Sequence, residues 1–169
     1  MYSNETAIII PARKGSKGIK NKNLKLLNKK PLIYYVIKAC LNSSINKRVF
    51  VSTDSNKIAN YASSLGVEII QRPKHLGGDN VIIDDVINHS YNFLKKSLNY
   101  NPSYFLTVQP TCPLTTKLDI SKAFKILKKN SKTDTIISVT LEPHLFWIEK
   151  KNKLFKIYNN RVNRQQLPK

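Results

Sequence analysis

The sequence predicts an α/β fold in which a mostly parallel sheet is covered by helices on both faces. Short runs of β-branched residues alternate with longer amphipathic segments, which is the order expected of right-handed strand–helix–strand units. The first run, Thr6–Pro11 (TAIIIP), is a continuous apolar stretch ended by proline, as in strands buried on both faces. At 169 residues the chain is long enough for one domain with a sizeable core.

Local signals predict each element in order along the chain. After the first strand we expect an alternation of helices and strands, at 32–41 (helix), 48–52 (strand), 56–65 (helix), 67–70 (strand), 83–96 (helix), 104–108 (strand), 118–129 (helix) and 135–140 (strand). Pro31 stands where proline favours the first turn of a helix, and Asp54 or Ser55 can cap the second helix. Gly66 is positioned to end that second helix.

The alternation stops after Thr140, which divides the chain into two expected parts. Residues 1–141 are expected to form the α/β core. Residues 142–169 contain Trp147, a short strand pair around 154–158 and a polar, basic end. We therefore expect the second part to lie outside the main sheet.

The composition limits the partners and the compartment. The chain carries 29 Lys and Arg residues against 10 Asp and Glu, a formal net charge of +19, so nucleic acid, an anionic membrane and phosphate-rich small molecules all fit as partners. Most of these cations are lysines spread along the chain, which is also the pattern of a solvated surface.

No apolar run approaches the roughly 20 residues of a membrane span, and the N-terminus lacks a targeting pattern. Two cysteines, Cys40 and Cys112, are too few for a disulfide framework or a four-ligand zinc site, and we expect a cytoplasmic protein.

The segment after the first strand, PARKGSKGIKNKN at residues 11–23, has the composition of an anion-binding loop. Gly15 and Gly18 allow a tight turn that presents backbone N–H groups to an anion. Five cations surround these glycines, namely Arg13, Lys14, Lys17, Lys20 and Lys22. Neither of the two common phosphate-loop motifs is present, so a solvated basic turn remains the alternative. Because ligands of parallel sheets lie beyond the carboxyl ends of the strands, the position of the loop favours a phosphate site.

Several strings together resemble the CMP-N-acetylneuraminate (nonulosonic acid) cytidylyltransferase family. The strings IIIPARKGSKGIKNKN, KPLIYYVIKA, VSTDS, QRP and QPTCPL follow one another in the order of that family between residues 7 and 114. The resemblance resumes faintly at residues 164–168. It implies a Rossmann-like three-layer nucleotidyltransferase fold, with a nucleotide-binding core at 1–141 and a small dimerisation arm at 142–169. It also implies that CMP is transferred from CTP to a nonulosonic acid with release of pyrophosphate, by a homodimer that uses Mg²⁺.

The resemblance assigns site residues one by one. Arg13 and Lys22 match cations that would stabilise the charge on the phosphates as pyrophosphate leaves, and we expect them to be catalytic. The residues that match nucleotide-binding positions are Arg13, Ser16, Lys17, Lys22, Asn23, Arg72, Asp79, Gln109, Pro110 and Thr111. The residues that match sugar-binding positions are Gln109, Arg164 and Gln165. No residue is assigned to the metal, and Asp54 is expected to cap the next helix.

The chain also departs from the family pattern. Cys112 and Thr115 replace a serine and an arginine, and Val81–Ile83 stand where small hydroxyl residues are usual. The sequence stops at Lys169, before the late pair of aspartates that hold the metal in this family, so we expect a chain truncated at its C-terminus. A catalytically incomplete CTP-binding remnant is therefore one alternative. A basic nucleic-acid-binding protein is another, although aromatic residues are not interleaved with the basic ones as stacking requires.

The remaining titratable residues have structural interpretations. Asp84 and Asp85 are expected to lie at a helix start, where carboxylates favour the helix dipole. His75, His89 and His144 lie far apart in the sequence without ligand spacing. The sequence leaves the identity of the nonulosonic acid open.

Overall fold

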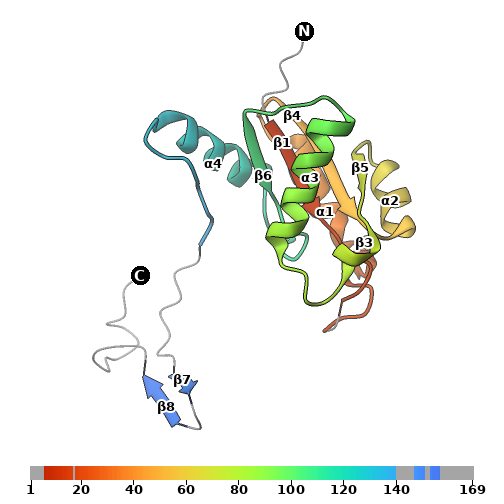
Figure 1. The fold of residues 1–169 in the computed structure, drawn as a ribbon, viewed down its shortest axis with the longest axis vertical. Helices are drawn as coiled ribbons and strands as arrows, with labels where there is room; N and C mark the ends of the chain where they lie inside the picture. Colours follow the sequence, from red (N-terminus) through yellow and green to blue (C-terminus); the bar gives the residue numbers. More distant parts are fainter. Residues whose placement is uncertain (1–5, 17, 140–146, 151–152, 157–169) are drawn as a thin grey trace. The chain divides into compact units, whose positions relative to one another are not determined.

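The computed structural model describes residues 6–16, 18–139, 147–150 and 153–156 (Figure 1). The chain divides into two compact units, residues 1–132 and 133–169. In the first unit a four-stranded sheet has the strand order β5-β4-β1-β6. Every neighbouring pair of these strands is parallel, and the bounds are Thr6–Pro11 for β1, Lys47–Thr53 for β4, Glu68–Gln71 for β5 and Tyr104–Thr107 for β6.

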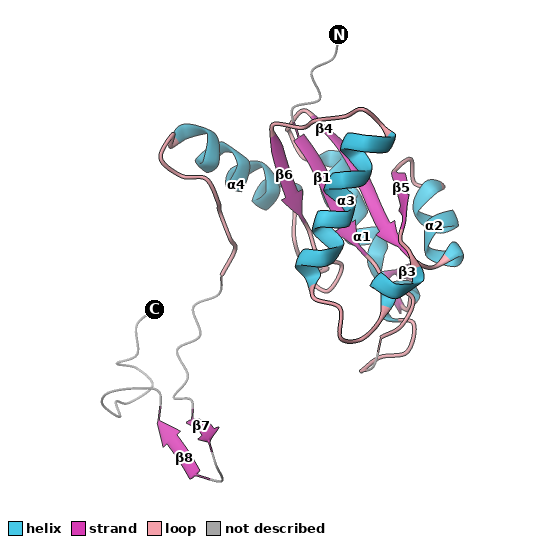
Figure 2. Ribbon diagram, viewed as in Figure 1, coloured by secondary structure: helices cyan, strands magenta, loops and turns pink. Residues whose placement is uncertain are grey.

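Helices cover both faces of this sheet, so the unit has three layers (Figures 1 and 2). The helices are α1 (Leu32–Asn42), α2 (Asn56–Ser63), α3 (Ile83–Ser97) and α4 (Lys117–Lys129). Because side chains alternate between the faces of a strand, Ile8 packs with the cluster that includes α1, α2 and α4, whereas Ile9 packs with Leu94 of α3. The α/β fold with a parallel sheet is thus confirmed.

Local chemistry explains where the helices begin and which faces they bury. The buried residues of α1 include Ile33, Val36, Ile37 and Cys40, at the spacing of one helix face. The hydroxyl of Ser55 accepts a hydrogen bond from the backbone N–H of Ile58 and caps α2. In α4, Thr116 and Asp119 form a reciprocal capping box.

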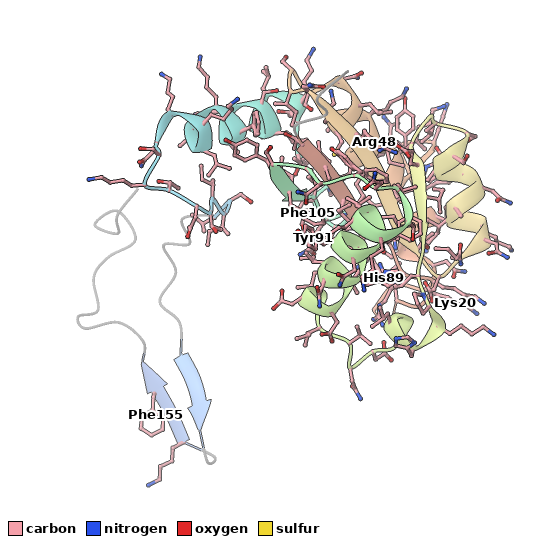
Figure 3. All side chains as sticks on the ribbon, turned by 45° about the horizontal axis from the view of Figure 1, so that its top comes forward. Lys20, Arg48, His89, Tyr91, Phe105 and Phe155 are labelled. Carbon is pink, nitrogen blue, oxygen red and sulfur yellow. The ribbon has the colours of Figure 1, made fainter. Side chains whose placement is uncertain are left out.

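Aromatic side chains join α3 to the edge of the sheet. The rings of Tyr91 in α3 and Phe105 in β6 meet edge to face, with centroids 6.2 Å apart (Figure 3). This contact holds α3 against one face of the sheet. The candidate site, described below, lies at the carboxyl edge of the same sheet.

Two predictions about the elements were wrong. Residues 135–139 form no strand, and Ile137 and Val139 are 77% and 81% exposed. A β-branched run becomes a strand only where a neighbouring strand pairs with its backbone, and no such pairing exists for these residues. The cap of α2 is Ser55 and not Asp54, whose carboxylate is bonded elsewhere.

Four short elements were not predicted from the sequence. The strands β2 (Leu26–Leu27) and β3 (Lys30–Pro31) form an antiparallel hairpin, and two 3₁₀ helices span Lys22–Leu24 and Lys74–Gly77. In the second unit, β7 (Trp147–Lys150) pairs antiparallel with β8 (Lys153–Lys156), which confirms a short strand pair near the predicted position. The described residues include no helix long and apolar enough to cross a membrane.

The β2–β3 turn yields a stability prediction. Asn28 and Lys29 both have positive φ, 45° and 65°, and this backbone costs a residue with a Cβ roughly 1–2 kcal/mol. Glycine adopts it freely but loses more entropy on folding, so Lys29→Gly is expected to raise the free energy of unfolding by about 0.5–1 kcal/mol in urea titrations. Lys30→Gly is the matched control, because Lys30 lies in β3, and it is expected to lower stability. A loss of stability in Lys29→Gly equal to that in the control would contradict the prediction.

Candidate functional site

A cavity of about 630 Å³ lies at the carboxyl ends of β1, β5 and β6. Its walls come from the loop after β1, the segment from β5 to the start of α3, and the loop after β6. All the described candidate nucleotide-binding residues line it, namely Arg13, Ser16, Lys22, Asn23, Arg72, Asp79, Gln109, Pro110 and Thr111. Lys17, Arg164 and Gln165 lie outside the described residues. The fold therefore brings together residues that are up to 98 positions apart in the sequence, from Arg13 to Thr111.

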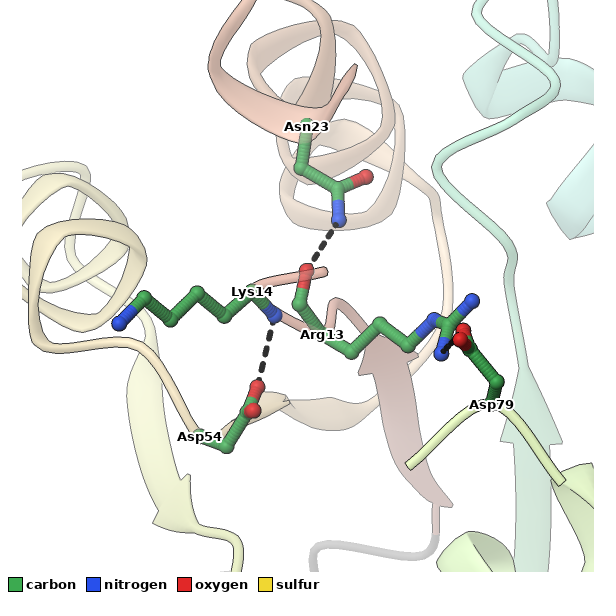
Figure 4. Close-up of polar contacts among 5 residues, drawn as sticks. All are labelled: Arg13, Lys14, Asn23, Asp54 and Asp79. Carbon is green, nitrogen blue, oxygen red and sulfur yellow. Dashed lines mark hydrogen bonds and ion pairs between the residues drawn. The ribbon is translucent and has the colours of Figure 1, made fainter. Parts of the chain in front are cut away.

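Arg13 links two walls of this cavity. Its guanidinium Nη1 lies 2.7 Å from Oδ1 of Asp79 (Figure 4). The backbone carbonyl of Arg13 accepts a hydrogen bond from Nδ2 of Asn23 at 3.1 Å. Asn23 is 6% exposed, so this bond is protected from competition with water. The loop after β1 is thus tied to itself through Asn23 and to the β5–α3 segment through Asp79.

Asp54 anchors the same loop from the neighbouring strand. Its Oδ1 accepts a hydrogen bond from the backbone N–H of Lys14 at 2.7 Å (Figure 4). Gly77 packs directly against this carboxylate, and a Cβ at Gly77 would meet the side chain of Asp54, 3.0 Å from its Cγ. Glycine at this position therefore leaves room for the side chain that holds the loop.

Arg72 is a buried cation in the cavity wall. The residue is 4% exposed, its Nη2 donates to the carbonyl of Ser52 at 2.8 Å, and its Nε donates to the Ser52 hydroxyl at 3.3 Å. Burial lowers the pKa of Arg72, the nearby carboxylate of Asp54 acts in the opposite direction, and the charge of Arg13 lowers it further. A guanidinium has five N–H donors, so the two bonds to Ser52 leave donors for a ligand in the cavity.

The two glycines of the loop after β1 do not supply its unusual backbone. Gly15 lacks a positive φ, and a Cβ built there would meet nothing within 4 Å. The left-handed position is taken by Asn21, with φ 53°. A positive φ in this loop thus falls at Asn21 and not at Gly15, whereas the tight turn expected around Gly15 and Gly18 includes Lys17, which lies outside the described residues.

His89 lies in α3 (Figure 3). Burial lowers the pKa of His89, and electrostatic interactions with Arg72 and His75 lower it further. Neither histidine lines the cavity. His144 lies outside the described residues, whereas Asp84 and Asp85 lie in the first turn of α3 as predicted.

The carboxylates of the described residues bear on where a magnesium ion could be held. Within the ranges that the structure covers, no three His, Cys, Asp or Glu side chains are grouped so that they could hold a metal ion. Asp79 is the one carboxylate among the described lining residues, and it is paired with Arg13. Magnesium is commonly held by one or two carboxylates together with substrate phosphates, so Asp79 is the described lining residue that could contribute a carboxylate to such a site.

The two cysteines differ as expected. Burial raises the pKa of the Cys40 thiol to about 12, which keeps it protonated and inert in the core. Cys112 is exposed in the loop after β6.

Sequence reasoning noted the apolar residues Val81–Ile83 but assigned none of the apolar residues to the lining of the cavity. Leu76, Val81, Ile83 and Val86 line it, and we call these four residues the aliphatic wall. Only Val86 is fully buried in the core, while Ile83 is 40% exposed. One feature of the sequence could have indicated this apolar lining: an apolar run, Val81–Ile83, stands where α3 begins and where a polar capping residue is usual. The Ile82 side chain accordingly makes no capping hydrogen bond.

Comparisons with known proteins agree with this geometry. The family model described as Cytidylyltransferase matches residues 7–167. An N-acylneuraminate cytidylyltransferase of Escherichia coli O18:K1:H7 is 37% identical over 134 residues, which cover 78% of this chain and 30% of that protein. A CMP-N,N'-diacetyllegionaminic acid synthase of Legionella pneumophila is 36% identical over 138 residues, covering 80% of this chain and 59% of that protein. The chain thus spans less than two thirds of the length of each of these relatives.

A solved structure supports the fold. A CMP:2-keto-3-deoxy-manno-octonic acid synthetase complexed with CTP superposes with a TM-score of 0.62 at 20% identity, covering 75% of this chain and 48% of the other. At this level of identity the likeness establishes the Rossmann-like nucleotidyltransferase fold alone.

Proposed function

The chain belongs to the cytidylyltransferase family, and from this premise we propose that it binds CTP and transfers CMP to a nonulosonic acid with release of pyrophosphate. One observation carries the proposal: a single cavity at the carboxyl edge of the parallel sheet is lined by Arg13, Lys22 and Arg72. Three cations in one cavity complement a triphosphate. The names of two relatives, which refer to an N-acylneuraminate and to a diacetyllegionaminic acid, support a nonulosonic acid as the acceptor.

The proposed reaction is an in-line displacement at phosphorus. The anomeric hydroxyl of the sugar acid gives its proton to solvent water and attacks the α-phosphate of CTP, so that a new P–O bond forms. The bond from the α-phosphate to the bridging oxygen breaks, and pyrophosphate leaves with that electron pair. Because negative charge grows on the leaving oxygens, Arg13 and Lys22 would stabilise the transition state more than the bound substrate.

Three further features belong to the proposal. Mg²⁺ would accompany the triphosphate as its counterion, with Asp79 as the one cavity carboxylate in the described part of the chain. Residues 142–169, which include β7 and β8, would form the arm of a homodimer. The cytoplasm, where CTP is made available, would be the compartment of the reaction.

Two measurements test the proposed function. At a CTP concentration of about 100 times Kd, binding should raise the free energy of unfolding by about 2.7 kcal/mol and Tm by roughly 5–10 °C, while ATP, GTP and UTP at the same concentration raise Tm less. Pyrophosphate release from CTP plus N-acetylneuraminic acid or diacetyllegionaminic acid then tests transfer.

Other outcomes distinguish the alternatives. Equal Tm shifts from CTP, ATP and GTP would overturn the proposal. CTP binding without pyrophosphate release would identify a binding remnant. Tight, steeply salt-dependent binding of duplex DNA without a nucleotide effect would favour a nucleic-acid-binding protein.

The Asp54 anchor gives a matched pair of variants. In Asp54→Asn the side-chain oxygen can still accept the hydrogen bond from the backbone N–H of Lys14, so the affinity for CTP should stay within about threefold of the wild-type affinity. Asp54→Ala loses this hydrogen bond and should weaken CTP binding about tenfold. Both variants remove the charge near Arg72, so their difference isolates the hydrogen bond. Equal CTP dissociation constants for the two variants, measured by calorimetry, would show that the anchor does not position the loop.

A further inference from the structure

We propose that the β2 edge of the β2–β3 hairpin docks on the surface of an anionic lipid bilayer. The segment concerned is KLLNK at residues 25–29, in which two exposed leucines stand between lysines. None of these five residues lines the cavity, so the inference is independent of the proposed function.

The hairpin is fixed to α1 but lies outside the main sheet. The strands β2 and β3 form a sheet of their own, separate from the four-stranded sheet (Figure 1 labels β3). The backbone N–H of Leu32 donates to the carbonyl of Lys25 at 2.9 Å, and the hydroxyl of Tyr35 donates to the carbonyl of Leu27 at 2.5 Å. These bonds hold β2 in one orientation at the surface of the unit.

Both leucines of β2 are accessible to a partner. Leu26 is 67% exposed and Leu27 is 44% exposed, and neighbouring side chains of a strand point to opposite faces. Neither face of the hairpin is therefore fully covered. A rigid, flat partner would cover one face, whereas a fluid bilayer that takes up the edge of β2 removes both side chains from water, which is favourable.

The charges around β2 complement an anionic surface. Lys25 and Lys29 flank the two leucines, and both lysines are exposed. Between Thr6 and Thr53 the sequence contains 11 Lys and Arg residues and no Asp or Glu. No ion pair among the described residues involves Lys25 or Lys29. These lysines can therefore reach lipid phosphates while the leucines enter the boundary between headgroups and acyl chains.

A nucleic acid fits the same residues less well. Its phosphates would attract the two lysines, but leucine side chains offer its bases neither hydrogen bonds nor a stacking platform. A lipid surface uses the leucines and the lysines in one contact, and we therefore choose it as the partner.

Vesicle flotation with the full chain at about 0.1 M salt tests the inference. Vesicles of phosphatidylcholine with about one third phosphatidylglycerol should bind the chain at least about tenfold more tightly than vesicles of phosphatidylcholine alone. Leu26→Ser should weaken binding to the mixed vesicles about fivefold, because its side chain no longer moves apolar surface out of water. Leu118→Ser is the matched control: Leu118 of α4 is 69% exposed, and its variant should keep the wild-type affinity.

Two pairs of lysine variants test the position of the charge at equal net charge. Lys25→Gln with Lys29→Gln should weaken binding about 25-fold, since each lysine near an anionic surface contributes about fivefold. Lys95→Gln with Lys96→Gln removes the same charge from exposed positions in the last turn of α3 and should weaken binding less than about threefold.

Leu26→Trp reports the contact directly. Tryptophan favours the membrane interface, so this variant should bind the mixed vesicles at least as tightly as the wild-type chain. Its fluorescence emission should shift to shorter wavelengths on binding, beyond any shift of Trp147 in the wild-type chain. Leu118→Trp should show no such additional shift.

Several outcomes would overturn the inference. Equal binding to both kinds of vesicle would exclude an anionic surface as the partner. Equal losses in Leu26→Ser and Leu118→Ser, or in the two lysine pairs, would show that the hairpin is not the contact. A loss in the Lys25 and Lys29 pair without one in Leu26→Ser would indicate a polyanion such as nucleic acid. Release of the chain from vesicles by CTP would show that lipid phosphates occupy the cavity instead.

Discussion

Arg72→Met is expected to weaken CTP binding by about 100-fold while changing the stability of the free protein by no more than about 1 kcal/mol. The two effects differ because the guanidinium is buried without an ion pair among the described residues. Its 4% exposure removes most of its hydration, and Asp54 compensates its charge only from a distance. A bound triphosphate would supply the missing counter-charge.

The free energy of unfolding of Arg72→Met should change little, because one of the two groups that lose a hydrogen bond from Arg72 keeps another partner. The carbonyl of Ser52, which accepts from Nη2 of Arg72, also accepts from the backbone N–H of Ala12 at 2.9 Å. Methionine fills a similar volume without a charge that must be dehydrated, and replacing a buried charge in this way is often neutral.

Urea titration and calorimetry on the same variant check both halves of this prediction. Arg72→Lys is the control: it keeps the charge but loses the planar donor group, so its CTP affinity should lie between those of the wild type and Arg72→Met. An Arg72→Met chain with wild-type CTP affinity would remove Arg72 from the site. A chain that unfolds would show instead that the bonds to Ser52 hold β4 to the segment after β5.

Arg13→Ala is expected to weaken CTP binding by about 100-fold, and Lys22→Ala by about tenfold. Arginine can hold a phosphate with two hydrogen bonds, whereas lysine acts as a point charge. The loss of Arg13 also removes the cation 2.7 Å from Asp79, so a carboxylate would face the incoming triphosphate. In titrations without Mg²⁺, the double variant Arg13→Ala with Asp79→Asn should therefore recover part of the affinity that Arg13→Ala loses.

Lys25→Ala separates specific contact from general attraction. Lys25 is an exposed lysine close to this loop in sequence, and it does not line the cavity. Calorimetry at about 0.1 M salt should give it nearly wild-type affinity for CTP, because the field of an exposed charge is screened within about 10 Å at that salt concentration. If Lys25→Ala and Arg13→Ala weakened binding equally, the loop would act only through its total charge.

Local patterns in the sequence predicted most helices and strands, but they did not predict which strands pair or which partners the side chains find. Apolar spacing predicted α1 through α4 to within a few residues, because burying one helix face imposes a period that the chain itself displays. The same reasoning assigned a strand to 135–140, where residues 135–139 have no paired neighbour. It also assigned capping to Asp54, whose carboxylate instead accepts from the N–H of Lys14, 40 positions away.

Neighbours along the chain were enough to predict the α/β alternation, the cationic loop after β1 and the residues that resemble a family pattern. They could not predict that Arg72 is buried against Ser52, that Gly77 makes room for Asp54, or that an aliphatic wall adjoins the cations. Burial, desolvation and cavity shape arise from packing between strands and helices distant in sequence, and no local period encodes which side chains will meet there.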